Sequence, residues 1–347
     1  MGFRRITVFS MIAVGFGLPG CGDPAEPPPT AARAMTAHAE ELPNIIVLTV
    51  DTLRADHLAR YGYPRETMPT IENFADTAVV FDQAVVPRGS TRPSYASILT
   101  GLYPFRHGVR SNGAVLHADL FTLPEMIGAV GYHTAAFVSN FVLLGDLSNC
   151  SQGFDVYDDQ LGDREAHRPN FERTAAGTLK AILEWLESDP PQPFFLFTNF
   201  IDPHGPYEPP QRFREMYQSR ERRMLKLHQI PYYQQTPGVR DFYDFLDRYD
   251  GEVRFTDEAL AILIDELKTR HLWDDALVVF TADHGESMGE HDLFFEHHQN
   301  LWEATTRVPL MIRLPIDKED EAVPPLRISA ISEHRFRSNL NGHFGRS

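Results

Sequence analysis

The sequence predicts an α/β fold with a mostly parallel central sheet flanked by helices. Three apolar runs, at residues 44–50, 194–200 and 276–281, are typical of buried strands. Between them, apolar residues recur at helical spacing around residues 179–186 and 260–267. Strands that alternate with helices in this way build parallel units of one layered sheet.

Polar residues follow each of these three strands closely. Asp51 ends the first run, His204 lies just beyond the second, and Asp283 and His284 follow the third. The carboxyl ends of strands form the ligand crevice in open α/β sheets. We therefore expect these side chains to meet in space although they are far apart in the sequence.

The N-terminal segment has the features of an export signal. Arg4 and Arg5 precede an apolar run, residues 6–18, that is too short for a comfortable membrane span. The run ends in Leu18-Pro19-Gly20-Cys21, which resembles a bacterial lipoprotein signal. This predicts a signal peptide at residues 1–21, lipidation of Cys21, and a chain held at the membrane in the periplasm or cell envelope. The alternative is plain secretion with cleavage nearby.

The remaining chain divides into three parts. Residues 22–42, rich in Pro, Ala and Glu, are typical of an extended linker. Residues 43–318 are predicted to form the main folded domain, with a further strand at 307–312. The acidic and then polar segment 319–347 shows no periodicity and is expected to be an atypical tail.

Charge and cysteine content limit the classes of partner. The chain has 32 basic and 48 acidic residues and a net charge of −16, which argues against nucleic acid as the main partner. An anionic small substrate stays compatible with this charge, because a bound metal reverses the local field. Of the two cysteines, Cys150 is predicted to be a packed thiol. The composition predicts no particular oligomeric state.

Two carboxylates and an imidazole are candidates for a metal site. Asp51, Asp283 and His284, together with Thr91, would suit one divalent ion. Gly285 would let the backbone turn so that Asp283 and His284 both face the crevice. The alternative interpretation is that Asp283 only caps a turn and His284 lies on the surface.

Thr91 is the candidate nucleophile. The segment 93–99 suits the start of a helix, and Gly101 lies near its end. Thr91 would then stand at a helix N-terminus, where backbone N–H groups favour an anion. A hydroxyl bound there to a metal loses its proton more easily. The alternative is that Ser90 or Thr91 is only a helix cap.

Four segments resemble the sulfatase family of the alkaline phosphatase superfamily in order and spacing, at residues 43–56, 91–108, 202–206 and 281–309. The resemblance implies an alkaline-phosphatase-like fold and a hydrolase that cleaves sulfate or phosphate esters. It also places Asn112 where the family often has a polar contact to substrate.

The resemblance implies a reaction as well. One divalent ion (Ca, Mn, Mg or Zn), held by Asp51, Asp283 and His284, would bind Thr91 and an oxygen of an anionic ester. Thr91 would attack in line and form a covalent intermediate. His204 and His297 match positions that bind the anion and assist the leaving group. A second metal is not favoured, and His298 is left without a role.

Three departures from the family pattern widen the choice of substrate. Sulfatases carry Cys or Ser, converted to formylglycine, where this chain has Thr91, and Tyr95 replaces a supporting arginine. Thr52 stands where a second aspartate ligand often follows the first. A threonine nucleophile is similar to lipoteichoic acid synthases, phosphoethanolamine transferases and nucleotide phosphodiesterases. Phosphodiester cleavage or phosphoryl transfer is therefore an alternative.

The family usually continues beyond the strand at 307–312 with a small C-terminal subdomain, which we expect to be missing here. This leaves two further alternatives: a non-catalytic surface binding protein, and a truncated product that does not fold stably. A serine hydrolase of the Gly-x-Ser-x-Gly type is excluded, because the sequence has no such motif.

Overall fold

The protein is described by a computed structural model over residues 42–164, 171–298, 300–315 and 327–328. Residues 1–41 and most of 319–347 lie outside the described residues, and so do the predicted signal peptide, Cys21, the linker and most of the tail. Over the described residues, no helix combines the length and the apolar character that crossing a bilayer requires.

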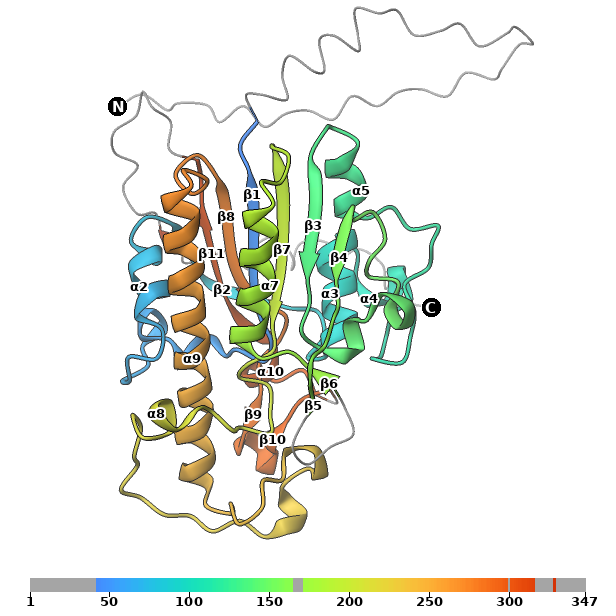
Figure 1. Ribbon diagram of the computed structural model, residues 1–347. Helices are drawn as coiled ribbons and strands as arrows, with labels where there is room; N and C mark the ends of the chain where they lie inside the picture. The colour runs from blue at the N-terminus through green and yellow to red at the C-terminus, as the bar shows by residue number, and fades with distance from the viewer. Residues whose placement is uncertain (1–41, 165–170, 299, 316–326, 329–347) are drawn as a thin grey trace, which may run out of the picture.

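A central sheet organises the chain (Figure 1). Its eight strands lie in the order β12-β2-β11-β8-β1-β7-β3-β4. Their bounds are β1 Ile45–Val50, β2 Val79–Val85, β3 His133–Phe137, β4 Val156–Asp158, β7 Phe194–Phe200, β8 Leu277–Ala282, β11 Arg307–Arg313 and β12 Arg327–Ile328. The five strands β8, β1, β7, β3 and β4 run parallel to one another, whereas β11 runs antiparallel to β8 and β2. The mostly parallel sheet predicted from sequence is confirmed.

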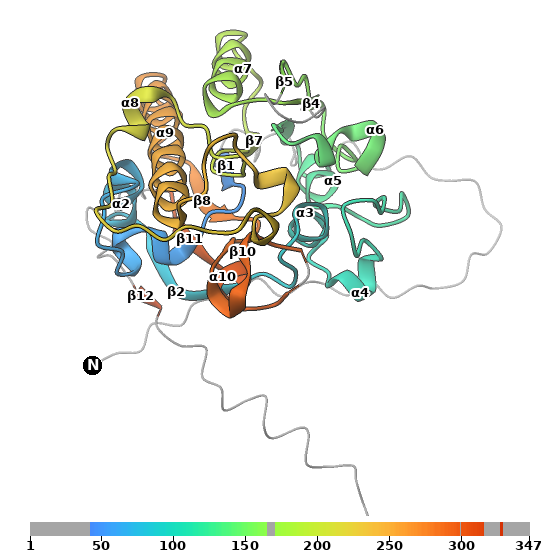
Figure 2. The same ribbon diagram turned by 90° about the horizontal axis from the view of Figure 1, so that it is seen from below.

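Helices cover both faces of the sheet (Figures 1 and 2). On one face, residues of β1 and β7 pack against α2, α7 and α9, and on the other against α3 and α5. The helices are α2 Pro69–Ala75, α3 Thr91–Thr100, α4 Pro104–His107, α5 Leu123–Gly128, α6 Gly145–Ser148, α7 Ala175–Glu187, α8 Gln211–Arg214, α9 Phe242–Thr269 and α10 Glu303–Thr306. The two predicted helical runs fall within α7 and α9.

The burial of strand β1 on both faces explains why residues 44–50 form a continuous apolar run. Ile46, Leu48 and Val50 belong to the core on the α7–α9 face, and Val47 belongs to the core on the α3 face. A central strand buried on both faces needs apolar residues at successive positions. Because β8 and β7 flank β1 in parallel register, Val50 lies level with Ala282 and Phe200. The residues that follow these three strands therefore emerge at the same edge.

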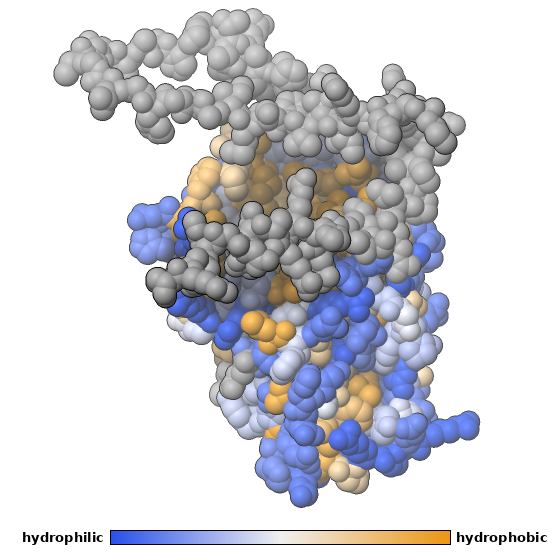
Figure 3. All heavy atoms as spheres, turned by 180° about the vertical axis from the view of Figure 1, so that it is seen from behind, coloured by the Kyte–Doolittle hydropathy of each residue, from blue (hydrophilic) through white to orange (hydrophobic). Residues whose placement is uncertain are grey.

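Short elements lie beyond that edge. They are the two-stranded sheets of β9 Ser287–Met288 with β10 Phe294–Glu296 and β5 Asp163–Arg164 with β6 Phe171–Glu172, and the 3₁₀ helices η1 Ala55–His57, η2 Ala59–Tyr61, η3 Phe141–Leu143, η4 Leu227–Gln229, η5 Tyr232–Gln234 and η6 Glu290–Asp292. Figure 1 places β9 and β10 below the sheet. On the face seen in Figure 3, hydrophilic residues cover most of this lower end. A site at the carboxyl edge would thus open toward a polar surface.

Candidate active site

Two aspartates and a histidine meet at the carboxyl edge of the sheet. Asp51 follows β1, and Asp283 and His284 follow β8; all three are fully buried. Each offers one donor atom to a group whose donors all lie within 4.8 Å of one another. Among the residues that the structure describes, no other set of His, Cys, Asp and Glu donors is this compact. The convergence expected from the strand ends is therefore observed.

The donor atoms suit a cation. Asp51 Oδ1 and Asp283 Oδ2 are buried and accept no hydrogen bond from any residue that the structure describes. His284 Nδ1 is 2.9 Å from the Gly285 carbonyl oxygen, to which it donates, so Nε2 presents a lone pair. This Nε2 lies 3.7 Å from Asp51 Oδ1 and 3.4 Å from Asp283 Oδ2. Two oxygens and one imidazole nitrogen fit a divalent metal ion.

Burial makes the charges of this cluster costly without a cation. It raises the pKa of Asp51 well above its usual range, and nearby Asp283 raises that pKa further. It also raises the pKa of Asp283 to about 8. Burial lowers the pKa of His284, although Asp51 opposes this shift. A bound cation would reverse the balance and favour both carboxylates in their ionised form.

Thr91 lies against this cluster at the first position of α3. Its Oγ1 is 3.3 Å from His284 Nε2, and the residue is buried. Ser90 precedes the helix without a side-chain capping bond, and Gly101 ends it with a left-handed conformation at φ 67°. The side chain of Thr91 thus faces the candidate metal ligands from a helix N-terminus.

Asn112 holds the start of α3. Its Oδ1 accepts hydrogen bonds from the Ser90 hydroxyl at 3.1 Å and from the Arg92 backbone N–H at 2.9 Å. Arg92 then donates to the Val142 and Ala114 carbonyl oxygens. Asn112 therefore lies beside the candidate nucleophile, at a position that fixes the turn leading into its helix.

Four histidine rings lie close together at the site, and His297 contacts the other three. The ring centroids of His284 and His297 are 4.5 Å apart, and those of His297 and His298 are 3.9 Å apart. His204, beyond β7, lies 5.2 Å from His297. The structure thus places His297 against the candidate ligand His284 and His204 against His297, and it brings His298, for which no role was predicted, into the same group of rings.

Glu286 is a site residue that sequence reasoning missed. Its Oε1 accepts the Nδ1 proton of His297 at 2.9 Å, and its Oε2 accepts from Tyr207 and Gln234. The carboxyl is buried, and burial raises its pKa well above the usual range. The only sequence signal was its place three residues after Asp283.

Asn140 was also missed. It follows β3 and donates from Nδ2 to Asp51 Oδ2 at 2.7 Å, which fixes the orientation of that carboxylate. Its position just beyond a strand that runs parallel to β7 was the available signal. The long connection over residues 206–240 contributes Tyr233 of η5, whose ring centroid lies 6.1 Å from that of His297.

Position 285 requires glycine for a different reason from the one expected. Its backbone is not in the left-handed region; instead a Cβ there would lie 2.2 Å from the Ala304 carbonyl oxygen. Its N–H donates to the Thr305 carbonyl at 2.9 Å. Glycine is required because the chain after His284 passes directly against α10.

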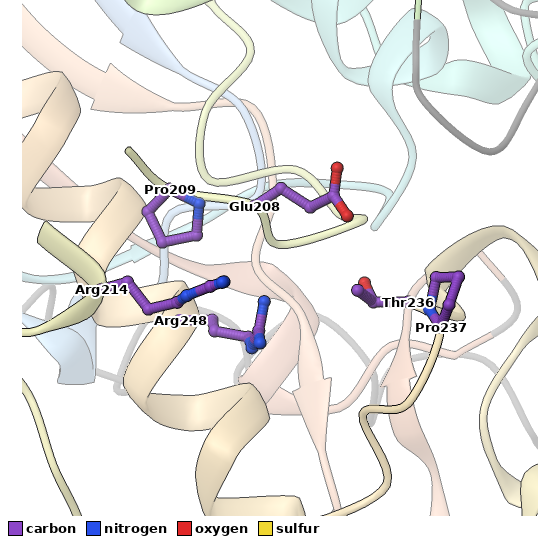
Figure 4. Close-up of a pocket in the computed structure, with 6 residues that line it drawn as sticks. All are labelled: Glu208, Pro209, Arg214, Thr236, Pro237 and Arg248. Atoms are coloured by element: carbon purple, nitrogen blue, oxygen red, sulfur yellow. The ribbon is translucent and has the colours of Figure 1, made fainter. Parts of the chain in front are cut away.

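A separate cavity of about 500 Å³ lies near the same segments (Figure 4). Arg214 and Arg248 approach it from one side, and Thr236 and Pro237 from the other. Glu208 and Pro209, which also line it, continue the segment that carries His204. None of the candidate catalytic residues lines this cavity.

Comparison with known proteins agrees with this geometry. A family model described as Sulfatase matches residues 43–339. The chain belongs to the sulfatase family. The match begins where the catalytic domain was predicted to begin and extends past residue 318.

Two curated members of the sulfatase family illustrate the distance to characterised relatives. An ulvan-active sulfatase of Formosa agariphila is 28% identical over 299 residues, covering 80% of this chain and 57% of that protein. A choline-sulfatase of Rhizobium meliloti is 25% identical, covering 79% of this chain and 63% of that protein. The chain thus spans about three fifths of the length of these relatives.

Solved structures show the same fold. A phosphonate monoester hydrolase of Agrobacterium radiobacter matches with a TM-score of 0.66 at 19% identity, covering 83% of this chain and 70% of that chain. A protein solved in complex with its substrate D-glucosamine-2-N,6-O-disulfate matches with a TM-score of 0.64 at 20% identity, covering 84% and 74%. The alkaline-phosphatase-like sulfatase fold expected from the sequence is confirmed.

Proposed function

We propose that this sulfatase-family chain is a metal-dependent hydrolase of sulfate or phosphate esters, with Thr91 as its nucleophile. The observation that carries the proposal is the position of Thr91 Oγ1, 3.3 Å from His284 Nε2, which itself lies 3.7 Å from Asp51 Oδ1 and 3.4 Å from Asp283 Oδ2. A cap residue would need no such neighbours. For a nucleophile they matter, because a cation held by Asp51, Asp283 and His284 would favour the ionised form of the Thr91 hydroxyl.

Asp51, Asp283 and His284 would hold the metal ion. Bound there, a divalent ion would neutralise charge on the ester oxygens and favour the ionised hydroxyl. Asn140 supports this set because its bond to Asp51 Oδ2 leaves Oδ1 of the same carboxylate as the donor. The proposed ligands are therefore oriented before any ion binds.

Thr91 would attack the sulfur or phosphorus of the ester in line. The Thr91 hydroxyl would give its proton to solvent water, and the bond from Oγ1 to the sulfur or phosphorus would form while the bond to the leaving oxygen breaks. Water would then hydrolyse the threonine ester, which releases sulfate or phosphate and restores the Thr91 hydroxyl. His204 or His297 would give a proton to the leaving oxygen. Glu286 supports this role for His297, because its bond to Nδ1 turns Nε2 away from Glu286.

A phosphate substrate is the second candidate. It is favoured by the threonine at position 91, which stands where sulfatases need a residue that can become formylglycine. Phosphodiester cleavage or transfer of a phosphoryl group to an acceptor alcohol would use the same attack and the same histidines.

An ester screen tests the proposal. The purified chain would be assayed on 4-nitrophenyl sulfate, 4-nitrophenyl phosphate and bis(4-nitrophenyl) phosphate, each with Ca²⁺, Mn²⁺, Mg²⁺ or Zn²⁺ and with a chelator. We expect metal-dependent turnover of at least one ester. The ester that is preferred separates the sulfatase from the phosphatase and phosphodiesterase candidates. A folded, metal-loaded protein that turns over none of them would support a binding protein instead.

We also propose that the chain is exported and anchored at the membrane through Cys21. The support is the apolar run that ends in Leu18-Pro19-Gly20-Cys21. Metabolic labelling with a fatty acid should mark the wild type and not Cys21→Ser. An unlabelled wild type would favour plain secretion.

A further inference from the structure

Close to the candidate active site, Arg88 is a cation that has no partner among the residues that the structure describes. It lies three residues before Thr91, in the connection from β2 to α3. Its side chain is half-buried, and its Nε is buried with no hydrogen bond. Within the described residues, the Arg88 side chain makes no hydrogen bond and no ion pair.

Several other buried or half-buried arginines of this protein differ from Arg88, because their guanidinium groups donate hydrogen bonds within the protein. Six that are buried or half-buried each donate to a carboxylate, a hydroxyl or a backbone carbonyl: Arg54, Arg65, Arg92, Arg173, Arg248 and Arg313. Arg173 and Arg313 also have a buried Nε without a hydrogen bond, but both donate through Nη2, whereas no described residue accepts from any nitrogen of Arg88. Leaving a charged donor buried and unbonded costs free energy. An external anion could accept hydrogen bonds from the Arg88 guanidinium, which donates to no described residue of the protein.

The connection that carries Arg88 is held firmly against the histidine segment. The His298 backbone N–H donates to the Gly89 carbonyl at 2.6 Å, and His298 Nδ1 lies 3.2 Å from the Ser90 hydroxyl. A Cβ on Gly89 would lie 3.1 Å from Thr305 Cβ, so this glycine permits the close approach. The backbone next to Arg88 is thereby held beside His298, and the charge of Arg88 helps to lower the pKa of His298, after the larger effects of burial and of His284.

The order of the histidines places Arg88 toward the outside of the site. His284 is fully buried, His297 is 2% exposed, and His298 is half-buried. The scissile group would lie at the inner end, against His284 and Thr91. A guanidinium near His298 would instead contact the leaving group, which is the alcohol portion of the ester.

We propose that Arg88 binds a second anionic group of the substrate, a carboxylate, sulfate or phosphate on the leaving portion of the ester. This inference rests on the proposed ester hydrolysis. A guanidinium presents paired N–H donors that match such oxyanions. The substrate class would then be esters whose alcohol carries its own negative charge.

Matched aryl esters test the proposal. The substrates are the sulfates, and in parallel the phosphates, of 2-, 3- and 4-hydroxybenzoate, each compared with the neutral carboxamide of the same phenol. We expect kcat/KM for at least one carboxylate isomer to exceed that for its carboxamide by about tenfold. Arg88→Gln should abolish that preference, Arg88→Lys should keep part of it, and the control Arg106→Gln, at an exposed position of α4, should keep all of it.

Several outcomes would overturn the inference. One is equal turnover of every carboxylate and carboxamide by the wild type. Another is a carboxylate preference that survives in Arg88→Gln. A third is an equal loss for both esters in Arg88→Gln, which would assign Arg88 to the scissile group.

A binding measurement separates this inference from the proposed activity. If no ester is turned over, the proposed function fails, and calorimetry on the metal-loaded chain still tests Arg88. Tighter binding of the carboxyphenyl esters than of their carboxamides, lost in Arg88→Gln, would support the anion site. No difference in affinity in the wild type would overturn it.

Discussion

Glu286 Oε1 lies 2.9 Å from His297 Nδ1, and both side chains are buried. A histidine held in this way has a fixed ring orientation and a preferred proton on Nδ1. Because Tyr207 and Gln234 also donate to Glu286, the pair is anchored to segments that wall the site. The pair fixes the orientation of the His297 ring, so the proposed role of His297 as a general acid can be tested through Glu286 as well.

The leaving group reports whether His297 acts as an acid. His297→Ala should lower kcat about 100-fold for an alkyl or phenyl ester, and much less for a 4-nitrophenyl ester, whose leaving oxygen needs no proton. Glu286→Ala should show the same dependence on the leaving group, because it acts through His297. The double variant should lose no more than His297→Ala alone. Additive losses would mean that Glu286 acts independently of His297.

Thr91 variants separate the nucleophile from a helix cap. Thr91→Ala should lower turnover by about 1,000-fold or more, because no hydroxyl remains to attack. Thr91→Ser should keep measurable turnover. Circular dichroism and metal content should stay close to wild type in both. Unchanged turnover in Thr91→Ala would remove Thr91 as the nucleophile.

Metal binding should stabilise the fold. Two buried carboxylate oxygens, Asp51 Oδ1 and Asp283 Oδ2, have no hydrogen-bond partner among the described residues, and a cation would satisfy both. At saturating Mn²⁺, Ca²⁺ or Zn²⁺ we expect Tm to rise by about 5 °C, with one ion per chain by metal analysis. Asp283→Asn should lose this rise, whereas Asp265→Asn, on the exposed face of α9, should keep it. Two ions per chain would contradict the single site.

Asp257 should make stability depend on pH. Burial raises its pKa from 3.8 to about 6, although the Thr70 and Ile71 backbone N–H groups donate to it. The folded state therefore binds this proton more tightly than the unfolded state, and stability falls as pH rises from about 4 to about 6. In Asp257→Asn the group cannot ionise.

Urea unfolding at several pH values checks this expectation. Between pH 4 and 7, the free energy of unfolding of Asp257→Asn should improve relative to wild type by up to about 3 kcal/mol. The matched variant Asp265→Asn should show no such trend. If the free energy of unfolding of the wild type instead rose relative to that of Asp257→Asn between pH 4 and 7, the raised pKa of Asp257 would be refuted.

The sequence predicted the parts of the site that backbone geometry determines. Asp51 and Asp283 follow strands in parallel register, so their meeting follows from the strand pattern alone. Glu286 and Asn140 depend on how loops turn after those strands, and no periodicity encodes such turns. A glutamate also reads as a surface residue, and its burial became evident only from Tyr207, Gln234 and His297 around it. Tyr233 reaches the site through a long connection for the same reason.

The most direct test of the account is to trap the threonine ester. The metal-loaded wild type would be mixed with the preferred ester, quenched within one turnover and digested for peptide mass spectrometry. We predict a sulfo or phospho group on Thr91, absent from Thr91→Ala and from a sample without substrate. Modification of another residue during productive turnover would contradict the central claim that Thr91 is the nucleophile.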